Sequence, residues 1–471
     1  MASHPIRSSE LPMEPAGRIS PVSAREDAVV KDRKIAAELK ALSRADSDYW
    51  TFRRGAVRRG AQGLTQYPAM MVPPMQAALL GVAAKVDREV RSVLDPFCGA
   101  GTTLVECMRR GLNYSGQDVN PLAILLCRVK AGPFHVQRLE TSAALVVERA
   151  VGDHGLKLEA DFPGLGKWFT RSAAIQLSRI RRAIRREPHE WCRRVFWTAL
   201  AETVRLSSNS RTSTFKLHVR NAVDLRTRTI DVIRIFTEVL SEIAIRLRDE
   251  ASALQQAGHL SSNGYYRGEV HVNLADTASN LPNIWPSGYD LLVTSPPYGD
   301  NTSTVPYGQY SYLPLQWIDL GDIDTTASSD CLASTYEIDH RSLGGSRKHA
   351  LRDAGEVLAR VPSLALTLSR LADVPVDRRS RVAAFCRDLD RCLDLVLKVL
   401  RPHAYMIWTV GNRRVGGRPV PTDAILSELL ESRGARCVTR IERRIPTKRM
   451  ATRNNVASTM RGESVLVFRK E

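Results

Sequence analysis

The 471-residue chain lacks several features that whole classes of protein require. None of its eight cysteines forms a Cys-x-x-Cys pair, which argues against a disulfide scaffold and against a zinc site. No stretch approaches the roughly 18 consecutive apolar residues of a membrane helix. The first 25 residues also lack the apolar core that a signal peptide needs. We therefore expect a cytoplasmic protein with reduced cysteines, no metal and no membrane association.

Positively charged residues outnumber negatively charged ones in this chain. The chain has 68 Lys and Arg against 50 Asp and Glu, a formal net charge of +18, while 43% of its residues are hydrophobic. The apolar content excludes a chain that is disordered throughout, and the length suggests two or three structural units. The positive charge favours a polyanionic partner, because each neutralised phosphate releases a condensed counterion. An arginine-rich composition can also reflect codon usage, so the charge alone identifies no function.

A β-α-β unit begins near residue 91. The buried strand Arg91–Asp95 leads through two glycines into a helix that stops at Gly111, and a second strand follows over Asn113–Val119. Further strands are expected over the segments 269–274, 290–294 and 404–410, with a terminal hairpin pairing 437–444 with 464–469. This pattern predicts the α/β class, with a Rossmann-like doubly wound sheet.

The spacing of these strands also predicts the organisation of the chain. About 150 residues separate the second strand from the third, far more than a βα connection needs, so we expect an inserted unit. Its apolar residues recur at helical spacing around 173–184, 190–206 and 229–256. The expected segments are a flexible N-terminal arm (1–45) ending in a helix over 31–42, the first part of the core (46–132), a mainly helical insertion that is a candidate for DNA binding or target recognition (133–267), the continued core (268–310), an irregular insertion that is a second candidate for target recognition (311–380), and the C-terminal part of the core (381–471).

The first informative motif follows the first strand: Asp95-Pro-Phe-Cys-Gly99-Ala-Gly101-Thr-Thr. Glycines at a strand-to-helix turn let a ligand lie against bare backbone beside the N–H groups of a helix end. Asp118, at the end of the next strand, can accept hydrogen bonds from both hydroxyls of a ribose. Because the spacing differs from Gly-x-Gly-x-x-Gly, an adenosine ligand other than a nicotinamide dinucleotide is favoured.

The second motif, Thr294-Ser295-Pro-Pro-Tyr298-Gly, ends a buried strand. Ligands of such folds bind at the carboxyl edge of the sheet. Two prolines remove two N–H donors and leave carbonyl acceptors in a stiff corner. Such a corner suits an exocyclic amine, which Ser295 and the Pro296 carbonyl can hold while Tyr298 offers a stacking face.

With these motifs the chain resembles the amino-group DNA methyltransferases that use S-adenosylmethionine. The glycine turn resembles their cofactor motif, and Ser-Pro-Pro-Tyr resembles the catalytic motif that is commonest among cytosine-N4 enzymes. Tyr67-Pro-Ala-Met-Met-Val-Pro73 resembles the segment that closes over the methionine end of the cofactor, and Asp276 stands where the family places a residue near adenine. The resemblance implies cofactor-binding residues Tyr67, Pro68, Asp95, Phe97, Gly99, Gly101, Thr102, Asp118 and Asp276, and catalytic residues Ser295, Pro296, Pro297 and Tyr298.

The implied reaction methylates the N4 amine of a cytosine that is flipped out of double-stranded DNA. It proceeds by direct displacement with neither a covalent intermediate nor a metal. The family association further implies a bacterial restriction-modification system with a companion restriction endonuclease. A cytosine-C5 enzyme would need a Pro-Cys nucleophile, and no cysteine of this chain follows a proline.

Contacts to DNA are expected from several basic segments, each of which could equally be a solvated surface. Bases specify and phosphates position, so these residues do not predict the recognised sequence. The candidates are Arg179, Arg182, Arg186, Arg211, Lys216, Lys448 and Arg449.

Three other functions remain open at this point. An adenine-N6 DNA methyltransferase more often carries Asp at the position of Ser295. An RNA guanine-N2 methyltransferase shares both motifs, but it usually has an acidic residue there and an RNA-binding domain before the core. A non-catalytic DNA-binding regulator could retain the scaffold, although both motifs are intact here.

Overall fold

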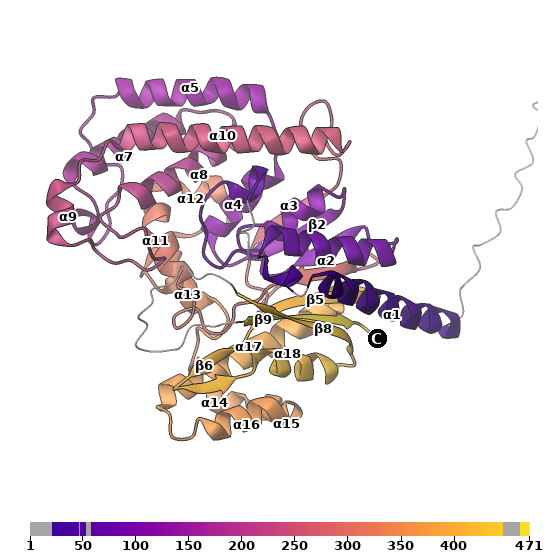
Figure 1. Cartoon of the computed structure of the whole chain (residues 1–471). Coiled ribbons are helices and arrows are strands. Elements are labelled where there is room, and N and C mark those ends of the chain that lie inside the picture. The colour runs from indigo at the N-terminus through magenta and orange to yellow at the C-terminus, as the bar shows by residue number, and fades with distance from the viewer. Residues whose placement is uncertain (1–20, 47, 53–57, 446–461) are drawn as a thin grey trace, which may run out of the picture.

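The computed structural model describes residues 21–46, 48–52, 58–445 and 462–471. Within them a seven-stranded sheet has the order β3-β2-β1-β4-β5-β9-β8 (Figure 1). The first five strands in this order are parallel, and β9 is antiparallel to both of its neighbours. The strands are β1 (Ser92–Asp95), β2 (Asn113–Asp118), β3 (Val270–Leu274), β4 (Tyr289–Thr294), β5 (Leu400–Gly411), β8 (Arg436–Arg444) and β9 (Gly462–Arg469), with β6 (Arg413–Val415) and β7 (Arg418–Val420) forming a separate ribbon. The predicted α/β class and Rossmann-like sheet are confirmed.

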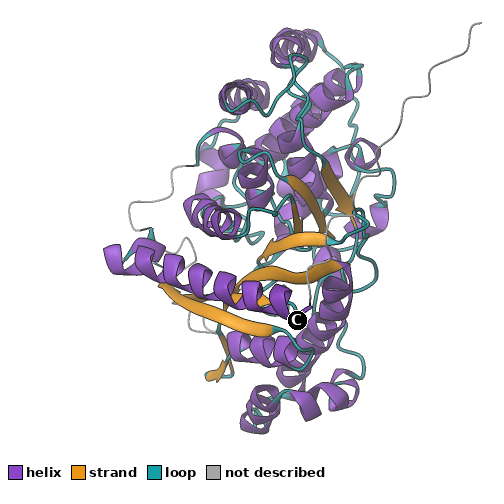
Figure 2. Cartoon of the chain, turned by 90° about the vertical axis from the view of Figure 1, so that its right-hand side faces the viewer, coloured by secondary structure: helices purple, strands orange, loops and turns teal. Residues whose placement is uncertain are grey.

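Helices cover both faces of this sheet (Figure 2). Side chains alternate between the two faces along each strand, as the period of two requires. Val93, Leu291 and Ile407 belong to one hydrophobic cluster, whereas Leu94 and Leu292 belong to the other. Because both faces are buried, the central strands read as continuous apolar runs in the sequence.

The helix at the N-terminus differs from the expectation of an arm over residues 1–45. α1 (Pro21–Ala45) is twice as long as the predicted helix over 31–42 and contacts α2 (Pro73–Val86) and β8. Its Ile35 and Leu39 are buried. Asp32 receives hydrogen bonds from Arg469 and from the hydroxyl of Tyr405. The expected arm is therefore helical from Pro21 and buries side chains from Ala28 onward, while residues 1–20 lie outside the described part.

The insertion between β2 and β3 consists mainly of helices, and these gather at one end of the molecule (Figure 1). The core contributes α3 (Thr102–Met108) and α4 (Pro121–Ala131) before the insertion begins. The helices of the insertion are α5 (Val136–Gly152), α6 (Leu165–Trp168), α7 (Arg171–Arg185), α8 (Glu190–Ser207), α9 (Ala222–Thr227) and α10 (Val232–Gln256). Of these, α10 packs against both α5 and α8.

The segment 311–380, expected to be irregular, is largely helical. Its helices have only 4 to 11 residues, and prolines and glycines interrupt them, so no long apolar periodicity marks them in the sequence. They are α11 (Tyr307–Trp317), α12 (Leu320–Ile323), α13 (Glu337–Arg341), α14 (Ala350–Asp353), α15 (Gly355–Arg360) and α16 (Pro362–Arg370), and the C-terminal core adds α17 (Val376–Val399) and α18 (Thr422–Glu431).

Candidate active site

The two sequence motifs meet at the carboxyl edge of the sheet. β1 and β4 are parallel neighbours, so the loops that follow them emerge side by side. The Thr294 hydroxyl donates a 2.6 Å hydrogen bond to Asp95 and ties the two strand ends together. A cavity of about 790 Å³, its open mouth included, lies above them. The predicted site residues that line it are Tyr67, Pro68, Phe97, Gly99, Thr102, Asp118, Asp276, Ser295 and Pro297.

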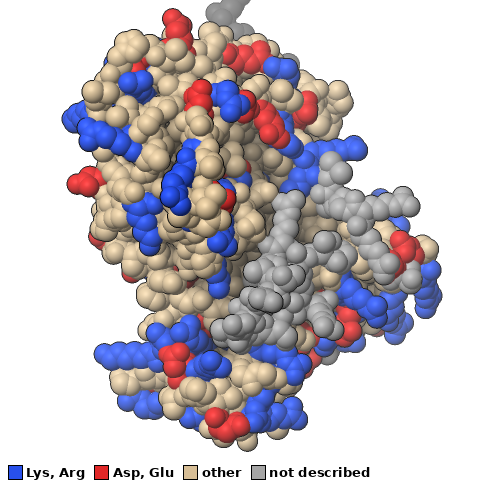
Figure 3. All heavy atoms as spheres, turned by 60° about the vertical axis from the view of Figure 1, so that its left-hand side comes forward, with Lys and Arg blue, Asp and Glu red and all other residues tan. Residues whose placement is uncertain are grey.

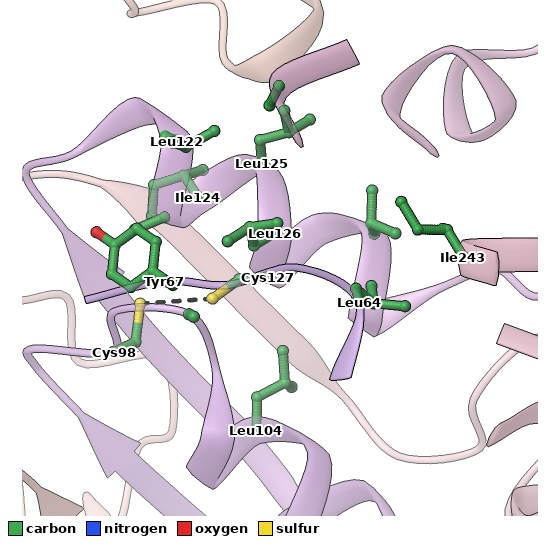
Figure 4. Close-up of a cluster of buried hydrophobic side chains, with 14 of the residues drawn as sticks. Leu64, Tyr67, Cys98, Leu104, Leu122, Ile124, Leu125, Leu126, Cys127 and Ile243 are labelled. Atoms are coloured by element: carbon green, nitrogen blue, oxygen red, sulfur yellow. Dashed lines mark hydrogen bonds between the residues drawn. The ribbon is translucent and has the colours of Figure 1, made fainter. Parts of the chain in front are cut away.

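The two glycines of the turn have different surroundings. Both have a positive φ, +48° at Gly99 and +71° at Gly101, which favours glycine. At Gly99 a Cβ would meet nothing closer than the Tyr67 ring at 3.9 Å, and this residue opens onto the cavity. At Gly101 a Cβ would lie 2.9 Å from Sγ of Cys127. Gly101 therefore permits close packing of α4, in the cluster beneath the turn where Cys98 and Cys127 meet (Figure 4).

Asp118 presents its carboxylate to the cavity from the end of β2. Oδ2 accepts the Gly99 N–H at 3.0 Å and Oδ1 accepts the Asn120 N–H at 2.9 Å. Burial raises the pKa of the Asp118 carboxyl, these backbone hydrogen bonds lower it, and the net result is a pKa of about 6. Each carboxylate oxygen has a second lone pair for a ligand hydroxyl.

Asp95 and Asp276 are both cofactor-binding residues by the family resemblance, but only Asp276 lines the cavity. Asp95 is fully buried beneath the cavity, where burial raises its pKa to about 6, and it supports the two loops without lining the space between them. Asp276 lines the cavity after β3. Its oxygens accept the Ala278 N–H at 3.0 Å and the Ser279 hydroxyl at 2.9 Å, which shapes the loop.

The proline corner is held from β5 and β9. Ser295 Oγ donates to the Thr409 carbonyl at 3.0 Å. The Tyr298 hydroxyl donates to Oε1 of Glu463 at 2.9 Å, and Glu463 in turn pairs with the nearly buried Arg443 at 3.0 Å. Pro296 and Tyr298 are not among the residues that line the cavity. The hydrogen bond to Glu463 directs the expected stacking residue toward the antiparallel strand.

A buried ion-pair network anchors the residues just after this corner, and sequence reasoning missed it. Asp300 accepts from Arg413 at 3.0 Å and from Arg381 at 3.1 Å. Although burial raises its pKa, Arg413 and the other donors lower the pKa of Asp300 to about 2. Gly299 has φ +143°, and a Cβ there would overlap the Arg413 guanidinium. Arg413 and Asp300 are 113 residues apart in the sequence, so no local pattern indicates that they pair.

Asn120 is a second residue that the sequence did not single out. Its side-chain amide donates to the Tyr67 hydroxyl and to Ser311 Oγ, each at 2.8 Å, while its oxygen caps α4. It thereby joins the wall of the cavity to α11. The Asn-Pro pair at a helix start was the only available signal, and it indicates a cap and not this bridge.

The basic residues proposed for DNA binding fall into three groups. On α7, Arg182 pairs with Asp153 and Glu159, Arg179 donates to the Gly155 carbonyl, and Arg186 is exposed. Arg211 and Lys216 lie in the loop between α8 and α9, and neither pairs with a carboxylate of the described residues. Lys448 and Arg449 lie outside the described residues.

The described part of the chain has neither a metal-binding cluster nor a membrane-spanning helix. No group of three or more His, Cys, Asp or Glu side chains is arranged to hold a metal ion. No helix there is both long and apolar enough to cross a membrane. Of the eight cysteines, Cys437 is exposed and the other seven are buried.

Comparison with known proteins relates this arrangement to methyltransferases. No protein-family model matches the chain. It is 27% identical over 445 residues, 92% of this chain and 95% of the relative, to the type II methyltransferase M.MvaI of Kocuria varians. A short segment of 48 residues, 10% of this chain and 9% of the relative, is 44% identical to the type II methyltransferase M.MjaII of Methanocaldococcus jannaschii.

Among solved structures, the rRNA methyltransferase aviRa of Streptomyces viridochromogenes aligns with 88% of this chain and 96% of its own, at 13% identity and a TM-score of 0.31. The sequence relationship to M.MvaI, by contrast, extends over both chains almost from end to end. The chain is thus a homologue of the type II methyltransferases.

Proposed function

We propose that this protein is a DNA methyltransferase that transfers a methyl group from S-adenosylmethionine to the N4 amine of a cytosine flipped out of duplex DNA. One observation carries the proposal: a single cavity is lined both by the glycine turn, through Gly99, and by the proline corner, through Ser295 and Pro297. A methyl group can pass directly between ligands held by the two loops. The homology to type II methyltransferases supports DNA as the substrate.

The lining of the cavity suits the proposed cofactor. Asp118 keeps carboxylate lone pairs that can accept from two ribose hydroxyls, and the segment Asp276–Thr277 is placed to border an adenine. Tyr67 and Pro68 form the wall on the side of the turn. The sulfonium of the bound cofactor supplies an electrophilic methyl group.

The proline corner is built to orient an amine. Since Ser295 Oγ donates its proton to the Thr409 carbonyl, its lone pairs remain free to accept an N–H of the target base. The second acceptor that we propose is the Pro296 carbonyl, which lies between the two cavity-lining residues Ser295 and Pro297, and neither proline offers an N–H that would compete. Two acceptors fix the amine so that the nitrogen lone pair faces the methyl group, and catalysis consists of positioning and of stabilising the positive charge that grows on nitrogen.

Mass spectrometry of nucleosides tests both the reaction and the target. After incubation of unmethylated plasmid DNA with the protein and S-adenosylmethionine, we expect N4-methylcytosine. N6-methyladenine in its place would support the adenine-specific alternative. Transfer to tRNA without transfer to duplex DNA would overturn the proposal, as would binding of DNA with no methylation. Long-read sequencing of a co-expressed plasmid would give the sequence context, and restriction of unmodified DNA by a companion endonuclease would test the restriction-modification role.

Cofactor affinity is expected to depend on pH through Asp118. The charged carboxylate is the better acceptor for ribose hydroxyls, and burial raises its pKa to about 6. Affinity should therefore be full above this pH and fall as pH drops through about 6, where the carboxylate is protonated. Calorimetric titration with S-adenosylmethionine between pH 5 and 8 measures it. Asp118→Asn should bind weakly with a flat profile, whereas an unchanged slope in that variant would assign the titration to another group.

The ring and the hydroxyl of Tyr298 can be tested separately. Tyr298→Ala removes the stacking surface and should lower methylation about 100-fold, since base–aromatic stacking is worth about 1–3 kcal/mol and alignment of the amine is lost as well. Tyr298→Phe keeps the ring and removes the hydroxyl, with its hydrogen bond to Glu463 at 2.9 Å and its longer contact with Ser295 Oγ at 3.4 Å, so a loss of about tenfold or less is expected. Full activity in the alanine variant would rule out the stacking role. Cofactor affinity, measured in parallel, should remain unchanged in both.

A further inference from the structure

A second groove lies beside the candidate active site. Two segments that are far apart in the sequence form it. The helical insertion contributes Lys167, Trp168 and His218, and the segment after the proline corner contributes Gln309, Tyr312 and Tyr336. The Leu217 N–H donates to the Gln309 side chain at 3.1 Å and joins the two walls.

This groove and the active-site cavity lie on either side of α11. Tyr307 lines the cavity and Gln309, two residues later on α11, lines the groove. The loop between α8 and α9 packs Phe215 against Tyr310, with ring centroids 5.7 Å apart, and Tyr310 packs against Tyr67 at 5.8 Å. α11 and these packed rings therefore form a wall that the two spaces share, which puts the groove next to the cavity.

The charges around the groove differ from those on α7. The arginines of α7 that face Asp153, Glu159 and Asp319 are neutralised within the chain. Arg211 and Lys216, on the loop beside the groove, pair with no carboxylate of the described residues. A cation without an internal carboxylate partner gains more from neutralising a phosphate than one already paired within the chain. Figure 3, with the left-hand side of Figure 1 turned forward, shows Lys and Arg side chains scattered over this face among Asp and Glu side chains.

The aromatic residues of the groove suit an unstacked base. Tyr336 is 43% exposed, and its ring lies nearly parallel to that of His340. The Lys167 ammonium lies 4.8 Å from the centroid of the buried Trp168 ring, which holds this positive charge at the side of the groove. Aromatic platforms combined with nearby cations are the usual means of holding a nucleic-acid strand without base pairing.

We propose that this groove binds the DNA strand next to the flipped nucleotide, with Tyr336 stacking on a base and Lys167, Arg211 and Lys216 binding phosphates. The proposal rests on the proposed function. It assigns DNA contact jointly to the insertion at 133–267 and to the segment 311–380, each of which supplies one wall, and it excludes the ion-paired face of α7 as the main contact.

The phosphate contacts are tested by the salt dependence of DNA binding. We expect Arg211→Ala/Lys216→Ala to weaken binding of a fluorescein-labelled 30-base-pair duplex about tenfold or more. The slope of log Kd against log salt should become shallower by about 2, because each lost phosphate contact removes about 0.9. Lys40→Ala, which removes an exposed cation on α1, should bind as the wild type does. An unchanged slope in the double variant would overturn the phosphate assignment.

The base contact is tested with Tyr336→Ala, whose exposed side chain can be removed without opening the core. The KM for plasmid DNA should rise about tenfold, with cofactor affinity unchanged. Tyr336→Phe should restore the wild-type KM, because it keeps the ring. An alanine variant with the wild-type KM would overturn the stacking contact. Absence of any DNA methylation by the wild type would refute the proposed function itself, whereas an active wild type with unaffected variants refutes only the groove.

Discussion

Ser295→Ala is expected to lower the kcat of DNA methylation by about 10²–10³, the range seen when one positioned hydrogen-bonding group is removed from an active site. Alanine leaves the Thr409 carbonyl without its donor and, above all, leaves the amine with one acceptor in place of two. The fold should persist, because the side chain is small and only partly buried. Single-turnover transfer of a tritiated methyl group to plasmid DNA measures the effect.

A control variant distinguishes the loss of the hydrogen-bond acceptor from a general disturbance of the fold. Ser252→Ala alters an exposed serine on α10, away from the cavity, and should retain wild-type kcat. Cofactor affinity of Ser295→Ala should stay within about twofold, because Ser295 accepts a hydrogen bond from the target amine and makes none with the ribose of the cofactor. A Ser295→Ala enzyme with wild-type kcat would exclude Ser295 as an acceptor. A loss of cofactor affinity equal to the loss of rate would indicate that the cavity as a whole had changed.

Asp300→Ala is expected to destabilise the protein by about 3–5 kcal/mol, the usual cost of removing one member of a buried ion pair. Its carboxylate is 1% exposed and receives Arg413, which is 8% exposed, so the variant leaves a buried guanidinium without its charge partner. Methylation should fall even where the protein remains folded, because the loop after Tyr298 loses its anchor. Urea unfolding and methylation assays on the same sample measure both effects.

The chain offers a matched control for this prediction. Asp377 also pairs with Arg381, at 3.1 Å, but its side chain is 53% exposed. Asp377→Ala should therefore cost less than about 1 kcal/mol. In a double-mutant cycle, Arg413→Ala should cost much less in the Asp300→Ala background than in the wild type. Additive effects would show that the two side chains do not depend on each other, and the anchoring role would then be wrong.

Much of the fold could be predicted from the sequence because local residue patterns determine it. Continuous apolar runs that end in polar residues located the core strands, and helical periodicity located α7, α8 and α10. The glycine turn and the proline corner could be placed at one edge of the sheet because the carboxyl ends of parallel strands share an edge.

Other features could not be predicted because their partners lie far away in sequence. Glu463 reaches Tyr298 across 165 residues, through the pairing of β9 with β5. The basic face of α7 looks like a DNA-binding surface in the sequence, but Asp319, 134 residues beyond Arg185, pairs with both Arg181 and Arg185. The short helices of 311–380 have too few residues to show a period and depend on tertiary contacts for their stability.

The sequence by itself determined the order of the core elements and the two motifs, because backbone conformation at glycine and proline and the burial of apolar strands follow from local chemistry. Only the tertiary structure decided which charged side chains have no ion-pair partner among the described residues and which group each hydroxyl contacts. Asp95 supports the cavity, Asp118 lines it, and the Tyr298 hydroxyl faces Glu463. These assignments depend on which strands become neighbours, and that follows from packing the whole chain around one sheet.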